Sequence, residues 1–91
     1  MTIKVSIEDS FVREAKRLPP DRRRSVRKAL EKFLLEPKLP SLRFRALEAA
    51  QGYYIINSSH GDRIILRKDA EDAFAVVDAG PHDNVYRRWN R

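Results

Sequence analysis

The segment DAGPHDNVYRRW, residues 78–89, places a histidine and a tyrosine four residues apart and ends in a basic pair and a tryptophan. If the chain after Gly80 is helical, His82 and Tyr86 share a face, because side chains at i and i+4 are neighbours on a helix. An imidazole titrates close to neutral pH and can take or give a proton. A phenol can donate a proton or a hydrogen bond. The spacing therefore suits proton transfer at a shared reaction centre.

An arginine supplies the third component of such a centre. Arg63 begins the apolar run RIILR, which we expect to pair with the strand preceding Gly80. A guanidinium matches two oxygens of a phosphate. RNA can be cleaved by its own 2′-hydroxyl, so a protein needs only to move protons and stabilise the charged phosphorane. We predict Arg63, His82 and Tyr86 as catalytic, and four further arginines as substrate-binding: Arg45, Arg67, Arg87 and Arg88.

Each catalytic candidate also has a purely structural interpretation. His82 can cap the last helix, with Asp83 as a charge that complements the helix dipole. Tyr86 and Trp89 can pack on a sheet as part of the core. Arg63 can be a polar-face residue of an edge strand. The pattern alone leaves these alternatives open.

Composition limits the functions that are open to the chain. Its 91 residues predict one domain, 1–91, and its net charge of +6 favours a polyanionic partner such as RNA or DNA. Cysteine is absent, and three glycines cannot make a glycine-rich phosphate loop. A catalytic metal site would need both histidines, or one histidine with carboxylates, at a defined geometry. We expect no metal and no cofactor. No apolar run approaches the roughly 20 residues of a membrane span, so we expect a cytoplasmic protein without a membrane partner.

The first half of the chain predicts one strand and two helices. Apolar residues alternate over 3–7, which predicts a strand, and recur at helical spacing over about 9–17. A second helix is predicted from Pro20 to just before Pro37, with a basic run over 22–24 expected on its solvated face. Its apolar stripe is Val26, Ala29, Leu30, Phe33 and Leu34.

The second half predicts the sheet on which these helices pack. RFRAL is a lead-in strand, and YYIIN, RIILR and AFAVVD are rich in β-branched and aromatic residues. Hairpin loops are expected at 58–62 and 68–72, and Tyr53 and Tyr54 on opposite faces. The predicted fold is α+β. An N-terminal strand and a two-helix hairpin pack on a three- to four-stranded antiparallel sheet, followed by a short C-terminal helix.

The order of these segments resembles the RelE/ParE superfamily of toxins from type II toxin–antitoxin systems. The resemblance runs through FVREAKRLP, KFLLEP, LRFRALEAAQGYYIINSSHGDRIILR and FAVVDAGPHDNVYRR, and so covers essentially the whole chain. It implies a helical hairpin on a twisted sheet. It also aligns Arg63 with a phosphate-binding strand arginine, His82 with an acid/base position and Tyr86 with a catalytic or base-stacking tyrosine. Tyr54 and Ile56 stand where well-studied ribonuclease members carry lysines, so a histidine-centred variant fits better.

The resemblance implies one of two activities. One branch consists of metal-free, ribosome-dependent endoribonucleases that cleave mRNA and inhibit translation. The ParE-like branch inhibits DNA gyrase without being an enzyme. Both kinds are neutralised by a cognate antitoxin protein, which we expect to be acidic where it meets this basic chain. A non-toxic nucleic-acid-binding relative is the third interpretation.

Overall fold

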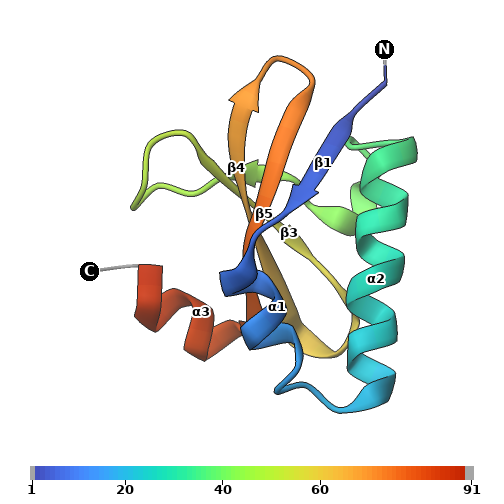
Figure 1. Cartoon of the computed structure of the whole chain (residues 1–91), viewed down its shortest axis with the longest axis vertical. Helices are drawn as coiled ribbons and strands as arrows, with labels where there is room; N and C mark the ends of the chain where they lie inside the picture. The colour runs from blue at the N-terminus through green and yellow to red at the C-terminus, as the bar shows by residue number, and fades with distance from the viewer. Residues whose placement is uncertain (1, 90–91) are drawn as a thin grey trace.

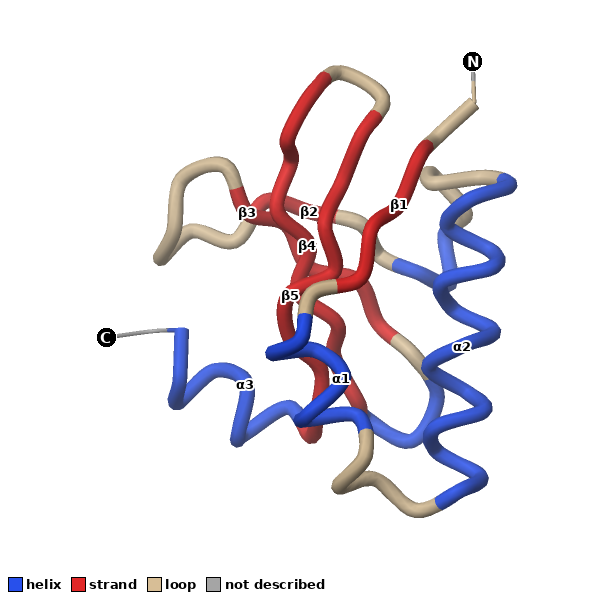
Figure 2. Tube along the Cα trace, viewed as in Figure 1, coloured by secondary structure: helices blue, strands red, loops and turns tan. Residues whose placement is uncertain are grey.

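Five strands form one mixed sheet in the computed structural model, which describes residues 2–89. The strands lie in the order β1-β5-β4-β3-β2. They are β1 (Lys4–Ile7), β2 (Arg45–Ala46), β3 (Tyr53–Asn57), β4 (Asp62–Ala70) and β5 (Ala73–Pro81). The helices are α1 (Asp9–Ala15), α2 (Pro20–Leu35) and α3 (His82–Trp89), with 3-10 turns η1 (Pro40–Leu42) and η2 (Ser59–Gly61). Figures 1 and 2 show the sheet between α2 on one side and α3 on the other.

The predicted three- to four-stranded antiparallel sheet is corrected in one respect. Strand β1 joins the same sheet and runs parallel to β5, with Lys4 opposite Ala73 and Ile7 opposite Val76. The alternation over 3–7 predicted a strand, but its partner lies far away in the sequence. Hairpin signals report only pairs of strands joined by short turns, so they could not reveal this contact.

Proline sets the limits of helix α2. Helix α2 begins at Pro20, where the missing N–H is not needed, and ends at Leu35, before Pro37. Helix α1 is shorter than predicted and ends at Ala15. The buried stripe of α2 consists of Val26, Ala29 and Phe33, whereas Leu34 is 42% exposed. The apolar stripe is therefore narrower than the sequence pattern indicated.

The β4–β5 hairpin is longer than predicted. The expected loop over 68–72 shortens to Glu71 and Asp72, because β4 continues through Ala70. Residues 68–70 are exposed, and the hairpin tip extends past the rest of the sheet (Figure 1). A strand that buries neither face tolerates charged side chains. Residues 68–70 are such a strand, and their charged composition is also typical of a loop.

Two hydrophobic clusters pack on opposite faces of the sheet. The cluster under α1 and α2 contains Phe11, Leu18, Val26, Ala29, Phe33, Leu42, Ile56, Ile64, Leu66, Phe74, Val76 and Ala79. The cluster under α3 contains Leu47, Ile55, Ile65, Ala75, Val77 and Val85. Tyr54 packs on the first cluster and Tyr53 on the second, as the period-2 alternation predicted. No helix within residues 2–89 has the length and apolarity needed to cross a membrane.

Candidate active site

Helix α3 begins with the predicted acid/base pair. His82 is its first residue and Tyr86 follows one turn later, so the two rings meet with centroids 4.4 Å apart. The His82 side chain is 52% exposed, and its Nδ1 lies 3.2 Å from a carboxylate oxygen of Asp83. The Tyr86 ring packs partly on the cluster under α3. The imidazole is thus open to solvent, while the phenol is held against the sheet.

Arg45 connects the Tyr86 hydroxyl to the sheet. Its Nη2 donates to the Tyr86 oxygen at 3.4 Å, and its Nη1 donates to Asn57 Oδ1 at 3.2 Å. The same Nη1 donates to the carbonyl oxygen of Arg43 at 2.6 Å, where the backbone is left-handed (φ 50°). Because the phenol oxygen accepts from Arg45, the phenol proton remains free for another partner.

Arg63 lies on the same face of the sheet, next to this network. It pairs with Asn57 of β3 and with Gly80 of β5, so the Asn57 and Arg63 side chains are cross-strand neighbours about 5 Å apart at Cβ. Its Nη1 donates to the carbonyl oxygen of Asp62 at 3.1 Å, and its buried Nε has no partner. Strand β4 is the middle strand of the sheet, so the edge-strand interpretation of Arg63 is wrong.

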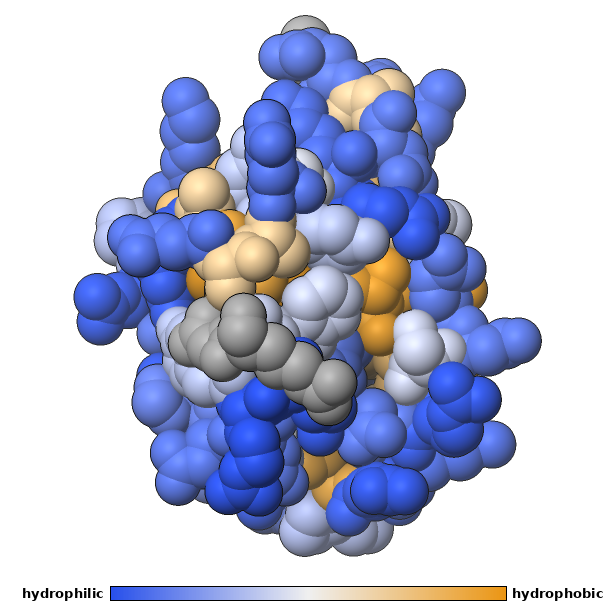
Figure 3. Space-filling view, turned by 90° about the vertical axis from the view of Figure 1, so that its left-hand side faces the viewer, coloured by the Kyte–Doolittle hydropathy of each residue, from blue (hydrophilic) through white to orange (hydrophobic). Residues whose placement is uncertain are grey.

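A hollow of about 240 Å³ opens beside Tyr86. It is lined by Arg45, Ala46, Leu47, Glu48, Ile55 and Tyr86. Figure 3 shows the side of the molecule that carries α3, where hydrophilic side chains predominate and hydrophobic ones appear only in small patches between them. Asn57 and Glu48 are polar residues of this site that sequence reasoning missed. Asn57 had a detectable signal, since period-2 alternation places it on the face of Ile55.

The carboxylate of Asp78 holds the other end of α3. Asp78 is 5% exposed and accepts hydrogen bonds from Arg88 Nε at 2.9 Å, Arg88 Nη2 at 2.9 Å and Trp89 Nε1 at 2.7 Å. The hydrogen bonds to Asp78 raise the pKa of the Arg88 guanidinium. Gly80, just before α3, has a φ of +155°, a backbone conformation that residues with a side chain rarely adopt. Arg88 therefore anchors the helix through Asp78, while its predicted substrate-binding role stays a prediction.

The remaining predicted arginines lie elsewhere. Arg67, nearer the hairpin tip, donates from Nε to Asp69 at 2.7 Å and from Nη1 to Glu8 at 3.1 Å. These hydrogen bonds raise the pKa of Arg67 and lower that of Asp69. Arg87 is exposed on α3. Of the four predicted substrate-binding arginines, the structure thus brings only Arg45 into contact with Tyr86.

The basic run at 22–24 contributes one arginine to a partly buried ion pair that the sequence did not reveal. Arg22 reaches from α2 to the fully buried Asp62 at the start of β4, donating from Nε at 2.9 Å and from Nη2. Hydrogen bonding to Asp62 raises the pKa of Arg22. The expectation of a solvated face holds for the exposed Arg23 and Arg24 but not for Arg22.

The structural interpretation of Trp89 is confirmed. Its ring centroid lies 5.1 Å from that of Tyr53, and it packs against the cluster under α3. Within residues 2–89, no three His, Cys, Asp or Glu side chains gather closely enough to hold a metal ion.

Comparisons with known proteins place this fold. A mutant of the E. coli toxin RelE in the free state superposes with a TM-score of 0.70 at 20% identity, over 99% of this chain and 96% of that one. RelE from the RelB–RelE complex of Methanococcus jannaschii gives 0.67 at 15% identity, over 92% and 98%. The complex from Pyrococcus horikoshii gives 0.67 at 18% identity, over 90% and 97%. No protein-family model and no curated protein sequence matches the chain.

These likenesses establish the fold. The chain has the RelE fold: an N-terminal strand, two helices, a sheet and a C-terminal helix. The fold expected from the RelE/ParE resemblance is therefore confirmed, with a mixed sheet in place of an antiparallel one.

Proposed function

We propose that the chain is the toxin of a type II toxin–antitoxin system, and that it is an endoribonuclease that cleaves mRNA on the ribosome. The arrangement of Arg45, Arg63, His82 and Tyr86 around one end of the sheet carries this proposal. The RelE fold supports it, because the similar structures are described as toxins and antitoxin–toxin complexes.

The charges of the site favour a phosphodiester. Arg45 and Arg63 form no ion pair with a carboxylate in the described part of the chain, although both are half-buried. A half-buried cation without a counter-ion is costly. A bound phosphate would remove that cost, which gives these arginines a reason to bind substrate that Arg67 and Arg88 lack.

The proposed reaction needs only proton transfers and charge stabilisation. The 2′-oxygen of the substrate loses its proton and attacks the phosphorus, and the bond from phosphorus to the 5′-oxygen breaks. The leaving 5′-oxygen takes up a proton, which yields a cyclic phosphate and a free 5′-hydroxyl. His82 transfers one of these protons, and Arg63 stabilises the charge on the phosphorane oxygens. The Tyr86 hydroxyl, whose proton is not used in its contact with Arg45, donates a hydrogen bond to a phosphate oxygen or to the leaving 5′-oxygen.

Programmed ribosomes provide the direct test. Purified chain is mixed with ribosomes carrying a defined mRNA, and the new 5′ ends are mapped. Wild-type chain should produce ends in the decoding region, and His82→Asn should lower the cleavage rate by about 10²–10⁴, the usual contribution of general acid–base catalysis. His60→Asn is the matched control, because asparagine tolerates the left-handed backbone of His60 (φ 64°) and no described contact joins His60 to Tyr86.

Other outcomes would contradict the proposal. A folded chain that leaves the mRNA intact would refute the nuclease assignment. Arrest of DNA gyrase that survives His82→Asn would instead identify a ParE-like binding protein.

We also propose a cognate antitoxin with an acidic segment as partner. The net charge of +6 supports it, since opposite charge favours association. Co-expression with the neighbouring open reading frame should raise soluble yield and relieve growth inhibition. Growth that is equally normal without any partner would contradict the toxin assignment.

A further inference from the structure

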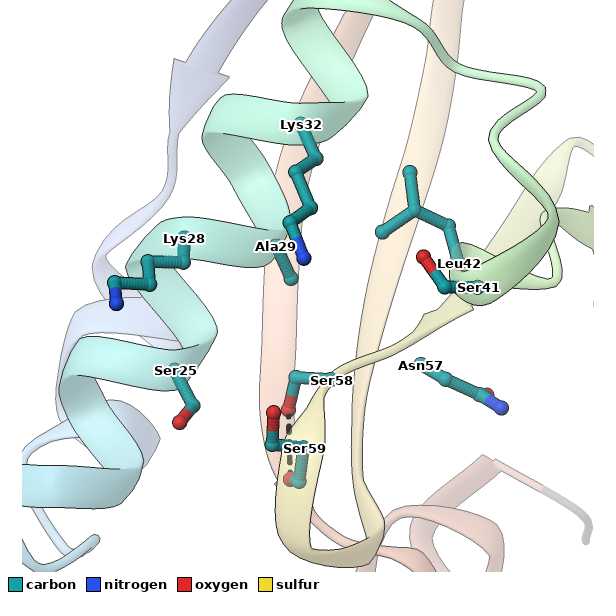
Figure 4. A pocket seen from close by; sticks show the side chains of 9 residues that line it. All are labelled: Ser25, Lys28, Ala29, Lys32, Ser41, Leu42, Asn57, Ser58 and Ser59. Atoms are coloured by element: carbon teal, nitrogen blue, oxygen red, sulfur yellow. Dashed lines mark hydrogen bonds between the residues drawn. The ribbon is translucent and has the colours of Figure 1, made fainter.

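A second basic cleft lies on the other side of β3 from the Tyr86 hollow. It has a volume of about 420 Å³ and is enclosed by α2, η1 and the segment after β3 (Figure 4). Its polar lining consists of two lysines, four serines and one asparagine: Lys28, Lys32, Ser25, Ser41, Ser58, Ser59 and Asn57. None of the lining residues is acidic.

The two lysines have no counter-ion within residues 2–89. Both are exposed, and neither belongs to any of the salt bridges found there. Figure 4 shows the Lys32 ammonium extending into the space between α2 and the segment 57–59, while the Lys28 ammonium, one turn earlier on α2, points away from that segment. The cleft thus combines uncompensated positive charge with a concave floor, which concentrates anions.

The serines suit an oxyanion with several oxygens. Ser25 Oγ donates to the Asp21 carbonyl oxygen at 3.3 Å, and Ser58 Oγ donates to that of Ser59 at 3.3 Å. Both bonds are long for a hydroxyl donor, so the hydroxyls can rotate toward a better acceptor. The lining offers no aromatic ring on which a base could stack. The chemistry therefore matches a phosphate group and not a nucleobase.

Asn57 joins this cleft to the candidate active site. It contributes to the lining of the cleft, while its amide points away from the lysines and accepts the hydrogen bond from Arg45. One residue at the end of β3 thus separates two concentrations of positive charge. A single strand of RNA that passes over Asn57 can reach both positively charged regions.

We propose that the Lys28–Lys32 cleft binds a backbone phosphate of the same RNA strand whose scissile phosphodiester lies at Arg63 and Tyr86. This inference rests on the proposed function, because it names the substrate as single-stranded RNA that extends past β3. The cleft contributes affinity and directs the strand, and it takes no part in the chemical step.

The test uses binding without cleavage. The probe is a single-stranded RNA oligonucleotide with 2′-O-methyl sugars, which lacks the attacking hydroxyl, and its affinity is measured by fluorescence anisotropy at several salt concentrations. Each lost phosphate contact lowers the slope of log K against log salt by about 0.7, and the affinity about fivefold at 0.1 M salt. Lys28→Ala/Lys32→Ala should show a loss of at least this size.

A matched double variant separates the cleft from general charge. Lys4→Ala/Lys16→Ala also removes two exposed lysines, and both lie outside the cleft lining. This control variant should change the slope of log K against log salt much less than Lys28→Ala/Lys32→Ala does. Equal losses in the two double variants, or a wild-type chain that does not bind the oligonucleotide, would overturn the cleft assignment.

The results also distinguish this inference from the proposed function. If the chain binds the oligonucleotide through the two lysines but leaves mRNA intact, the cleft assignment is supported and the nuclease assignment is refuted. If the chain cleaves mRNA but the slope of log K against log salt does not change when the two lysines are replaced, the nuclease assignment is supported and the cleft assignment is refuted. If inorganic phosphate shifts the NMR amide signals of Ser58 and Ser59 but the oligonucleotide does not, the site binds free anions and the RNA assignment is overturned.

Discussion

Replacement of Arg88 by methionine tests whether the Asp78 contact holds α3 in place. The change removes two charge-assisted hydrogen bonds at 2.9 Å and leaves Asp78 buried. Bonds to charged groups contribute about 1.5–3 kcal/mol each. Two features reduce the loss: the Arg88 side chain is 34% exposed, and Asp78 keeps its bonds from Trp89 Nε1 and the Ala79 amide. We expect a loss of about 2 kcal/mol in the free energy of unfolding.

Urea unfolding followed by far-UV circular dichroism measures this loss. In a domain of this size 1 kcal/mol shifts Tm by about 4–8 °C, so the variant should melt roughly 10 °C lower. Arg87→Met is the control, because Arg87 lies on the same helix and is exposed. An exposed substitution changes stability by only about 0.5 kcal/mol. Equal stabilities of the two variants would refute the anchoring role of Arg88.

The same substitution has a second consequence for the site. An eight-residue helix is not stable by itself in water, so α3 depends on its tertiary contacts. Loosening it displaces His82 and Tyr86 together, since both lie on α3. Amide hydrogen exchange in α3 should accelerate more than exchange in β4, and RNA cleavage should fall. Unchanged protection of α3 would contradict this reasoning.

Three further predictions concern other contacts. Arg22→Met strands the buried carboxylate of Asp62 and should lower the free energy of unfolding by about 3–5 kcal/mol, whereas the exposed Arg24→Met should not; equal urea midpoints would contradict this. Tyr86→Phe keeps the ring but loses the hydroxyl, so cleavage of ribosome-bound mRNA should fall at least tenfold with little change in Tm; wild-type rates would exclude a role for the phenol. Asp69→Asn should lower Tm slightly at pH 7, with the difference narrowing below about pH 4, because the lowered pKa of Asp69 stabilises the fold only while the carboxylate is charged; a pH-independent difference would refute the assigned cause.

Local signals in the sequence predicted most of the secondary structure. Pro20 and Pro37 delimit α2 because proline suits a first helical turn and disfavours helix at the residue before it. YYIIN predicted β3 with its bounds, because alternating apolar side chains must face two different clusters. These inferences succeeded because each depends on residues within one turn or one strand of each other.

Long-range contacts were outside the reach of such signals. The partner of β1 is β5, and the partner of Arg22 is Asp62, 40 residues away. The sequence shows that arginines are abundant, but it does not show which carboxylate lies within 3 Å of each one. For this reason the sequence does not distinguish Arg67 and Arg88, which are paired with acidic residues, from arginines without such partners.

The sequence by itself determined the chemical inventory: two imidazoles, no thiol, a net charge of +6, and a histidine and a tyrosine spaced to share one helical turn. Tertiary structure alone decided which of the arginines keep their charge available. Strand register places Arg63 beside Asn57, and the fold of β2 brings Arg45 to Tyr86. The physical reason is that burial and ion pairing depend on neighbours in space, and these neighbours come from segments that the sequence keeps far apart.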